Sequence, residues 1–385
     1  MAKKTTPQYF TESTSALYLA FELSSKNWKL GFSIGLGQKP RIRTIEAGDL
    51  DLLRSEIEGA RKRFRLPQEC PVVSCYEAGR DGFWLHRFLT AEGIENFVVD
   101  SASIEVNRRK RRAKADRLDV NALVRMLIRY CCGERKVWSV VHVPSAEEED
   151  RRQLHRTLSS LEKEKNRTRN RIAGLLATVG IRLPSRKALS EQEVEGIRMW
   201  DGTPLRPGLK GRIQGELAHM LFLKEQVCTL KRQRQNALRG KEQSAEPDLE
   251  KILQLRGLRG VGDVSAWLLV RELFGWREFT NGRQVGSLAG LTPTPYQSGG
   301  TNFEQGISKA GIVPVRQVAI ELAWCWLQYQ PGSKLSNWYN ERFAKAGKKA
   351  RKVGIVALAR RLLIELWRYL ETGALPEGAE LKTAK

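Results

Sequence analysis

Four carboxylates have types and spacings that could do chemistry. Glu22 ends a strand-like run, Glu77 directly follows another, and Asp116 and Asp119 are three residues apart, which places them on one face of a helix. Taken singly, each acid is more often a solvated charge or half of a salt bridge. Gathered together, they would repel one another unless cations lay between them. Mg²⁺ or Mn²⁺, which prefer oxygen ligands, would fit, and two such ions could clamp the attacking and leaving oxygens of a phosphodiester.

Ser298 is a second candidate, because Gly299 and Gly300 follow it in a polar segment that we expect to be a loop. Glycines would let a backbone phosphate approach the hydroxyl closely. Most loop serines are ordinary turn residues, however. The nearest histidine in the sequence is His219. A nucleophilic Ser298 would therefore need activation by residues or metal brought close by folding.

The acids need a framework, and the first 143 residues predict alternating strands and a few helices. In a sheet of the ribonuclease H type, the first and fourth strands are parallel neighbours, so Glu22 and Glu77 would meet at one edge. We expect strands over 17–23, 29–34, 41–45, 71–76 and 96–99, and helices over 49–64, 81–92 and 116–128.

The remaining sequence predicts helices. A capping box at Ser145 opens a long helix over 145–179, and a second follows over 211–238 after a break at 184–207. Their apolar stripes fit either a coiled-coil dimerisation arm or a pair that folds back on its own core. Beyond them, 255–262 and 264–270 have the pattern of a helix-hairpin-helix, and apolar helices are expected over 320–327 and 355–370.

Composition limits the classes of function. The 385 residues suggest two or three domains, and 66 Lys and Arg against 43 Asp and Glu give a net charge of +23, which favours a large polyanion as partner. No apolar run is long enough to span a membrane, and the first ten residues are polar, so we expect no membrane partner and a cytoplasmic protein. Six cysteines without a C-x-x-C motif argue against zinc.

Basic residues and glycine turns are the candidates for nucleic-acid contact. One basic run lies beside the two aspartates, the Gly-Val-Gly turn of the helix-hairpin-helix pattern could hold a DNA phosphate on backbone N–H groups, and two further cations follow Ser298. A solvated basic loop and an ordinary turn between helices are the alternatives. The candidates are Arg108, Arg109, Lys110, Arg111, Arg112, Lys114, Gly260, Gly262, Lys309 and Arg316.

Several motifs in one order resemble the IS110 insertion-sequence transposases, the bridge-RNA-guided DEDD recombinases. They are Y-E-A-G, K-A-D-R-L-D, R-G-V-G and L-A-G-L-T-P followed by S-G-G and G-I-S-K-A-G. The resemblance implies a RuvC-like domain over 1–143, a coiled-coil dimerisation segment over 144–247 and a helical transposase domain over 248–385. It also implies that Ser298 is the nucleophile and that Glu22, Glu77, Asp116 and Asp119 hold the metal. Glu22 departs from the family, which usually has Asp there.

The function implied is RNA-guided cleavage and rejoining of DNA through a transient phosphoserine. A structured guide RNA would pair with donor and target DNA, and the protein would assemble as a dimer or tetramer. Two other interpretations stay open. One is a RuvC-like nuclease that uses water on branched DNA, and the other is a non-catalytic nucleic-acid-binding relic whose acidic site has decayed at Glu22.

Overall fold

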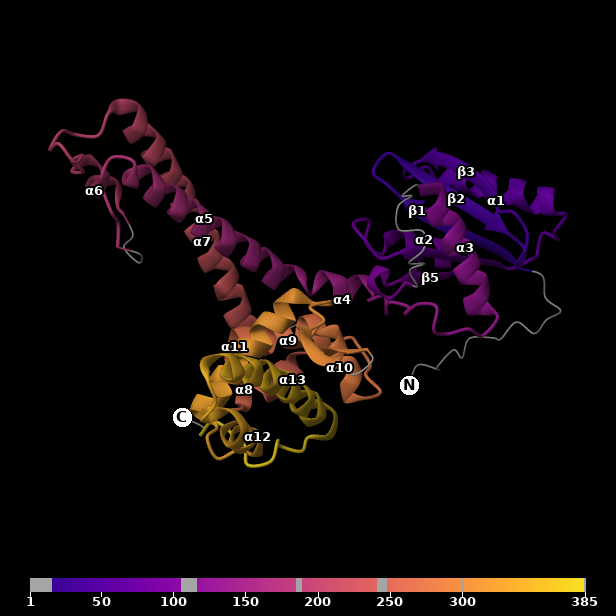
Figure 1. Cartoon of the computed structure of the whole chain (residues 1–385). Coiled ribbons are helices and arrows are strands. Elements are labelled where there is room, and N and C mark those ends of the chain that lie inside the picture. The colour runs from indigo at the N-terminus through magenta and orange to yellow at the C-terminus, as the bar shows by residue number, and fades with distance from the viewer. Residues whose placement is uncertain (1–15, 105–115, 185–188, 241–247, 299–300, 384–385) are drawn as a thin grey trace. The chain divides into compact units, whose positions relative to one another are not determined.

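The chain folds as two compact units, Met1–Val143 and Pro144–Lys385, in a computed structural model (Figure 1). The structure describes residues 16–104, 116–184, 189–240, 248–298 and 301–383. The further division of the second unit at 247/248 stays a prediction. Among the described residues, no helix is both long and apolar enough to cross a membrane.

Unit 1 is built around a five-stranded mixed sheet in the order β3-β2-β1-β4-β5. Strands β1, β4 and β5 are parallel, and β2 is antiparallel to β1 and to β3. The predicted strands and helices are confirmed, with shifts of a few residues at their ends. The elements are β1 (Leu17–Leu23), β2 (Asn27–Ser33), β3 (Arg41–Glu46), α1 (Leu50–Phe64), β4 (Val72–Glu77), α2 (Trp84–Ala91), β5 (Glu95–Val99), η1 (Ser101–Ser103) and α3 (Asp116–Cys131).

Both faces of this sheet are buried, each under its own helices. Alternate residues of β1 point to opposite faces, as a pleated strand requires. Leu19 and Phe21 pack in the core that α1 and α2 cover. Ala20 packs in the core that α3 covers, together with Val120 and Val124. The alternation therefore assigns every residue of β1 to a face.

Unit 2 contains the long helices and a smaller helical body. The helix predicted over 145–179 is divided at residues 151–152, although its capping box is present: Ser145 Oγ accepts from the Glu148 N–H at 3.1 Å. The elements are α4 (Ala146–Asp150), α5 (Gln153–Ala177), α6 (Glu191–Glu195), α7 (Pro207–Leu238), α8 (Leu249–Gly257), α9 (Asp263–Leu269), η3 (Val270–Phe274), α10 (Gly282–Leu288), β6 (Pro293–Ser298), β7 (Thr301–Ile307), α11 (Val313–Tyr329), α12 (Lys334–Tyr339), η4 (Asn340–Ala344) and α13 (Lys348–Thr372).

Helices α5 and α7 pack antiparallel along each other (Figure 1). Ion pairs mark the register: Lys231 Nζ lies 2.6 Å from Glu162 Oε1, and Arg171 Nε lies 3.0 Å from Glu216 Oε2. Thr168, a polar residue within the apolar stripe of α5, is fully buried, and its hydroxyl accepts from Arg171 at 2.9 Å. The two stripes therefore cover each other within one chain.

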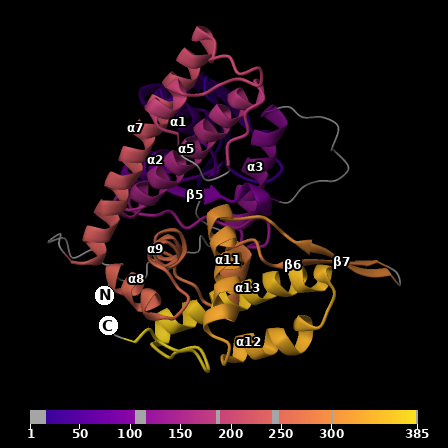
Figure 2. The same ribbon diagram turned by 90° about the vertical axis from the view of Figure 1, so that its left-hand side faces the viewer.

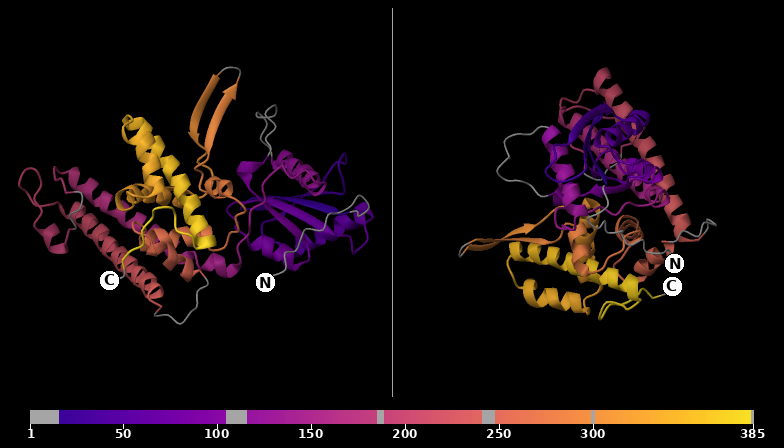
Figure 3. Two further views of the ribbon diagram at one scale, coloured as in Figure 1. Left: turned by 90° about the horizontal axis from the view of Figure 1, so that it is seen from below. Right: turned by 90° about the vertical axis from the view of Figure 1, so that its right-hand side faces the viewer.

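The segment expected to be a polar loop around Ser298 is instead a β-hairpin formed by β6 and β7. Figures 2 and 3 show this hairpin standing away from the helices of its own unit. At its base, the Ser308 N–H donates to Thr292 O at 2.9 Å and the Lys309 N–H to Gly290 O at 3.2 Å. The loop expectation was wrong because the pairing of the two strands satisfies their backbone groups without help from a core.

Two glycines let the chain segments cross closely at the base of the hairpin. A Cβ on Gly290 would lie 1.9 Å from Ala310 O, and one on Gly311 would lie 2.2 Å from Leu288 O. Both residues have positive φ, which favours glycine. Arg316 Nη1 donates to Ala289 O at 3.3 Å and to Ala310 O at 3.2 Å. These contacts fix the hairpin to the helical body.

We predict that Gly311→Ala lowers the free energy of unfolding by roughly 3 to 5 kcal/mol, the range of the largest point-mutation effects, because a backbone carbonyl cannot move aside. Gly306 is the matched control: its φ of 96° is also positive, but nothing lies within 4 Å of its Cβ position. Gly306→Ala should cost only about 1 to 2 kcal/mol of backbone strain. Thermal unfolding of the full chain measures both, and equal losses would contradict the close crossing.

We also predict that Gly31→Ala destabilises unit 1 by about 1 to 3 kcal/mol through overpacking. Its Cβ would lie 2.4 Å from Val120 Cγ1 and 2.9 Å from Val124 Cγ2, so α3 would have to move off the sheet. Gly35→Ala is the control, since the space around that residue is open and its φ is not positive. Calorimetry of the full chain would contradict the prediction if the two variants unfolded alike.

Candidate active site

Glu22 and Glu77 lie at matching positions on neighbouring strands. Strands β1 and β4 are parallel, and Phe21 pairs with Tyr76, so the two glutamates are the next residues along each strand. The predicted meeting of these acids at one edge is therefore confirmed. The alternation places both on the face that α3 covers, because Ala20 and Cys75, two residues earlier, pack in the α3 core.

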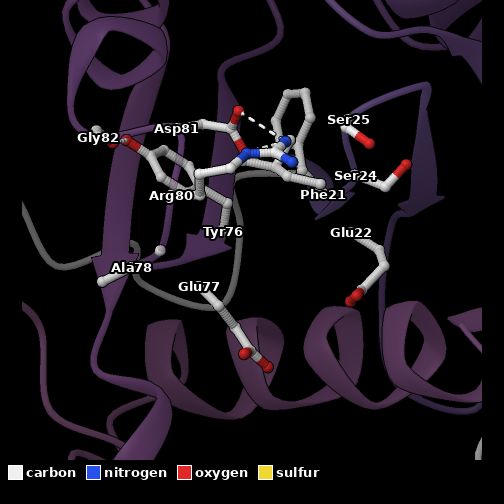
Figure 4. Close-up of a pocket in the computed structure, with 12 residues that line it drawn as sticks. Phe21, Glu22, Ser24, Ser25, Tyr76, Glu77, Ala78, Arg80, Asp81 and Gly82 are labelled. Atoms are coloured by element: carbon white, nitrogen blue, oxygen red, sulfur yellow. Dashed lines mark hydrogen bonds and ion pairs between the residues drawn. The ribbon is translucent and has the colours of Figure 1, made fainter. Parts of the chain in front are cut away.

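Both glutamates line one pocket of about 380 Å³. Figure 4 shows their carboxylates turned to the same side of it, away from the ion pair between Arg80 and Asp81. Arg80 Nη2 lies 3.1 Å from Asp81 Oδ1, and the Tyr76 hydroxyl donates to Gly82 O at 3.1 Å. These bonds fix the loop after β4, which forms one wall of the pocket.

Positive charge also faces this edge. Lys29 on β2 is the cross-strand partner of Glu22, so the two side chains share a face of the sheet and have opposite charges. Two carboxylates placed together need compensation of this kind, or a bound cation, to stay ionised. Lys29 is therefore a cation on the same face of the sheet as Glu22, although it does not itself line the pocket.

The first turn of α3 lies over the same face. Helix α3 begins at Asp116, and the side chain of Val120, one turn later, contacts β2 at Gly31. Gly31 pairs with Ala20, two residues before Glu22. The predicted position of the two aspartates at the start of a helix is confirmed for the backbone, and their side chains lie outside the described residues. The same holds for the whole of Arg108, Arg109, Lys110, Arg111, Arg112 and Lys114.

Among the residues that the structure describes, no group of three or more metal-ligating side chains is present. Glu22 and Glu77 line the pocket together with a third acid, Asp81, which is paired with Arg80. Whether Asp116 and Asp119 join them stays a prediction, because their side chains lie outside the described residues. The donor set fits Mg²⁺ or Mn²⁺, since it is made of oxygen atoms beside a polar pocket. Binding of the ion stays a prediction.

Ser298 is the last residue of β6 and pairs with Thr301, the first residue of β7. It therefore lies at the tip of the hairpin, beside a two-residue connection whose glycines are outside the described residues, as is the Ser298 side chain. The signal that could have revealed the hairpin is the Gly-Gly dipeptide between two short runs with aromatic residues. Lys309 is exposed, with a positive φ of 57°, and lies at the hairpin base rather than at its tip.

The predicted helix-hairpin-helix pattern corresponds to α8, a turn and α9. Gly260 has a φ of 84°, and a Cβ on it would lie 3.2 Å from Tyr329 Cβ. Gly262 is the N-cap of α9. Beside the turn is a pocket lined also by Arg259 and Lys382. Lys382 was missed by the sequence reasoning, because no local pattern connects it to a turn some 120 residues earlier.

Known proteins resemble the chain over part or nearly all of its length. The sequence model of the family described as "Transposase IS116/IS110/IS902 family" matches residues 253–337, which include α9 and the β6–β7 hairpin. The protein y4rJ of Sinorhizobium fredii, named as a transposase, is 40% identical over 378 residues, 96% of this chain and 95% of y4rJ.

A second relative is named by its mobile element. The transposase for insertion sequence element IS1328 of Yersinia enterocolitica is 26% identical over 225 residues, which are 58% of this chain and 63% of that transposase. At 96% of the chain, the y4rJ match extends over both units. The chain therefore belongs to the IS116/IS110/IS902 family of insertion-sequence transposases.

Proposed function

We propose that this transposase cleaves and rejoins DNA strands under the guidance of a structured RNA, with Ser298 as nucleophile and Glu22, Glu77, Asp116 and Asp119 as metal ligands. The observation that carries the proposal is the register of β1 and β4, which brings Glu22 and Glu77 into one pocket. Two like charges on adjacent strand ends repel each other, and a divalent cation bound between them would offset that repulsion.

A bound Mg²⁺ or Mn²⁺ would stabilise the negative charge that develops on a phosphodiester during cleavage. Glu22 and Glu77 would hold it from the sheet, and Asp116 and Asp119 from the first turn of α3. Glu22 has one more methylene than aspartate, and the pocket of about 380 Å³ leaves room for the longer side chain. This favours an active enzyme over a decayed one.

The proposed chemical step is a transesterification at phosphorus. The Ser298 hydroxyl loses its proton as its Oγ forms a bond to phosphorus, the bond from phosphorus to the 3′ oxygen breaks, and that oxygen takes up a proton. The reverse attack rejoins the strand, so no nucleotide cofactor is consumed. The position of Ser298 at the end of β6 supports this role. The hairpin stands away from the helices of its own unit (Figure 3), where a DNA backbone can approach it.

Guidance by RNA is supported by the charge of +23, which suits backbone recognition, with sequence choice left to base pairing. Recombination joins at least two duplexes, so we propose a dimer or tetramer. In the water-dependent nuclease, Ser298 would have no catalytic role. In the non-catalytic relic, the four acids would no longer support cleavage. Variants at these two places therefore separate the three functions.

We predict that Glu77→Gln lowers DNA strand cleavage by at least about 100-fold, as expected when a group that stabilises the transition state is lost. Binding of RNA from the element's end should change little, because the pocket lies within unit 1 and no basic residue is altered. Glu46→Gln, at the exposed end of β3, is the matched control. Cleavage should depend on Mg²⁺ and on that RNA. Unchanged cleavage by Glu77→Gln, or equal cleavage without RNA, would contradict the proposal.

We predict that the wild-type protein forms a covalent adduct with DNA that persists in denaturing gels, and that Ser298→Ala removes it. Ser308→Ala is the matched control, since Ser308 lies in the same segment but at the hairpin base. Mass spectrometry of the nuclease-digested adduct would locate the linked residue. If Ser298→Ala cleaved DNA at an unchanged rate, water would be the nucleophile.

A further inference from the structure

The C-terminal tail of the chain lies against the glycine turn between α8 and α9. Leu381 forms a β-bridge with Leu258. The Arg259 N–H donates to Glu380 O at 3.1 Å, and the Lys382 N–H donates to Gly257 O at 2.8 Å. Gln330, the C-cap residue of α11, joins both segments, since its Nε2 donates to Arg259 O at 2.9 Å and to Glu380 O at 2.8 Å. Backbone bonds therefore attach the tail to the turn.

This attachment places the ammonium group of Lys382 beside the turn. Lys382 Nζ donates to Arg256 O at 2.6 Å and to Val261 O at 2.7 Å. These carbonyls belong to the last turn of α8 and to the glycine turn, where carbonyl dipoles favour a cation. An ammonium has three N–H donors, so these two bonds leave one for an anion. The charge is held in place rather than spread over a flexible side chain.

The neighbouring pocket of about 480 Å³ has the chemistry of a phosphate site. Arg259, Tyr329 and Lys382 line it together with the glycine turn. Gly260 packs closely against α11, since a Cβ on it would lie 3.2 Å from Tyr329 Cβ. Arg259 and Lys382 are both exposed at this pocket.

The acids around this pocket are already paired. Glu380 forms an ion pair with Arg259, and Asp263 Oδ1 lies 2.8 Å from Arg256 Nε. With Lys382, three cations face two carboxylates, which leaves one net positive charge. The Glu380 carboxylate pairs with the Arg259 guanidinium and would compete with a phosphate for it. The exposed position of this ion pair allows such an exchange.

We propose that the C-terminal tail completes a binding site for a backbone phosphate of duplex DNA at the α8–α9 turn, with Lys382 as its fixed cation and Glu380 as an internal competitor. The inference rests on the proposed function in taking DNA as the substrate, but it does not involve the acidic pocket or Ser298. A fixed cation loses little conformational freedom on binding, so it sets the position of the duplex more firmly than a mobile lysine.

Binding of the full chain to a duplex of the element's end, measured by fluorescence anisotropy in EDTA over a series of KCl concentrations, tests the site without cleavage. Lys382→Met should weaken binding roughly five- to tenfold near 0.1 M salt and reduce the salt slope by about one. Glu380→Gln should tighten binding severalfold by releasing Arg259. Both variants keep the backbone bonds that attach the tail.

Lys334→Met is the matched control, because it removes one positive charge from a lysine paired with Glu377 of the same tail but outside the pocket. Its effect should stay within about twofold, as for a rim charge. Equal effects of Lys382→Met and Lys334→Met would overturn the proposal. So would a loss seen with structured RNA and not with duplex DNA.

If Lys382→Met also lowers the melting temperature, its weaker binding could come from partial unfolding. Glu380→Gln then tests the site: tighter DNA binding by this variant supports the proposal, and unchanged or weaker binding overturns it. The proposed function is tested separately: it is contradicted if the wild-type protein forms no adduct at Ser298 or if its cleavage of DNA does not depend on a metal ion. Either result can occur with the other intact.

Discussion

The parallel pairing of β1 with β4 is the constraint on which the candidate active site depends. A shift of one residue in its register would turn one of the two glutamates to the opposite face of the sheet. The register is held by the buried side chains that precede the acids, Phe21 and Tyr76 on one face and Ala20 and Cys75 on the other. Apolar burial on both faces thus supplies the stabilisation that holds two like charges together, and the acidic pocket is a consequence of the core beneath it.

In the β6–β7 hairpin, too, the candidate functional residue and the contacts that hold it in place lie at different positions. Its tip carries Ser298, while its base carries Gly290 and Gly311, where two backbone segments cross at a distance that excludes any side chain. Arg316 donates to the carbonyls of both segments at that crossing. The glycine-rich motifs on either side of the serine therefore have a structural explanation, namely a rigid base for the hairpin. Arg316, expected to contact nucleic acid, has a demonstrated structural role, and its contact with nucleic acid stays a prediction.

Sequence patterns predicted the elements of unit 1 well, because buried strands and amphipathic helices have distinct periodicities and because both faces of this sheet are covered. The meeting of Glu22 with Glu77 followed from topology alone. The hairpin at Ser298 was missed, since its strands are short and carry Pro293 and Pro295, which are unusual within a strand. The position of Lys382 beside the α8–α9 turn could not be predicted, because it depends on where residues 380–382 return in space. Periodicity encodes local structure and burial, whereas such tertiary contacts leave no local pattern.

The buried ionic cluster at the N-terminal end of α5 is another tertiary contact that no local sequence pattern predicts. Glu272, in η3, is almost fully buried and accepts hydrogen bonds from His155 Nε2 at 2.8 Å and from Arg156 Nε at 2.6 Å. Burial by itself would raise the pKa of this carboxyl group, but the bonds from His155 and Arg156 lower it to about 2. A buried charge that is paired so completely is costly to expose, and removal of one partner would leave the other unpaired in the interior. Helix α5 is thereby fastened to the helical body that carries the hairpin, so the α5–α7 pair and the serine belong to one unit. Any assembly formed through these long helices would also position the β6–β7 hairpin of the same unit.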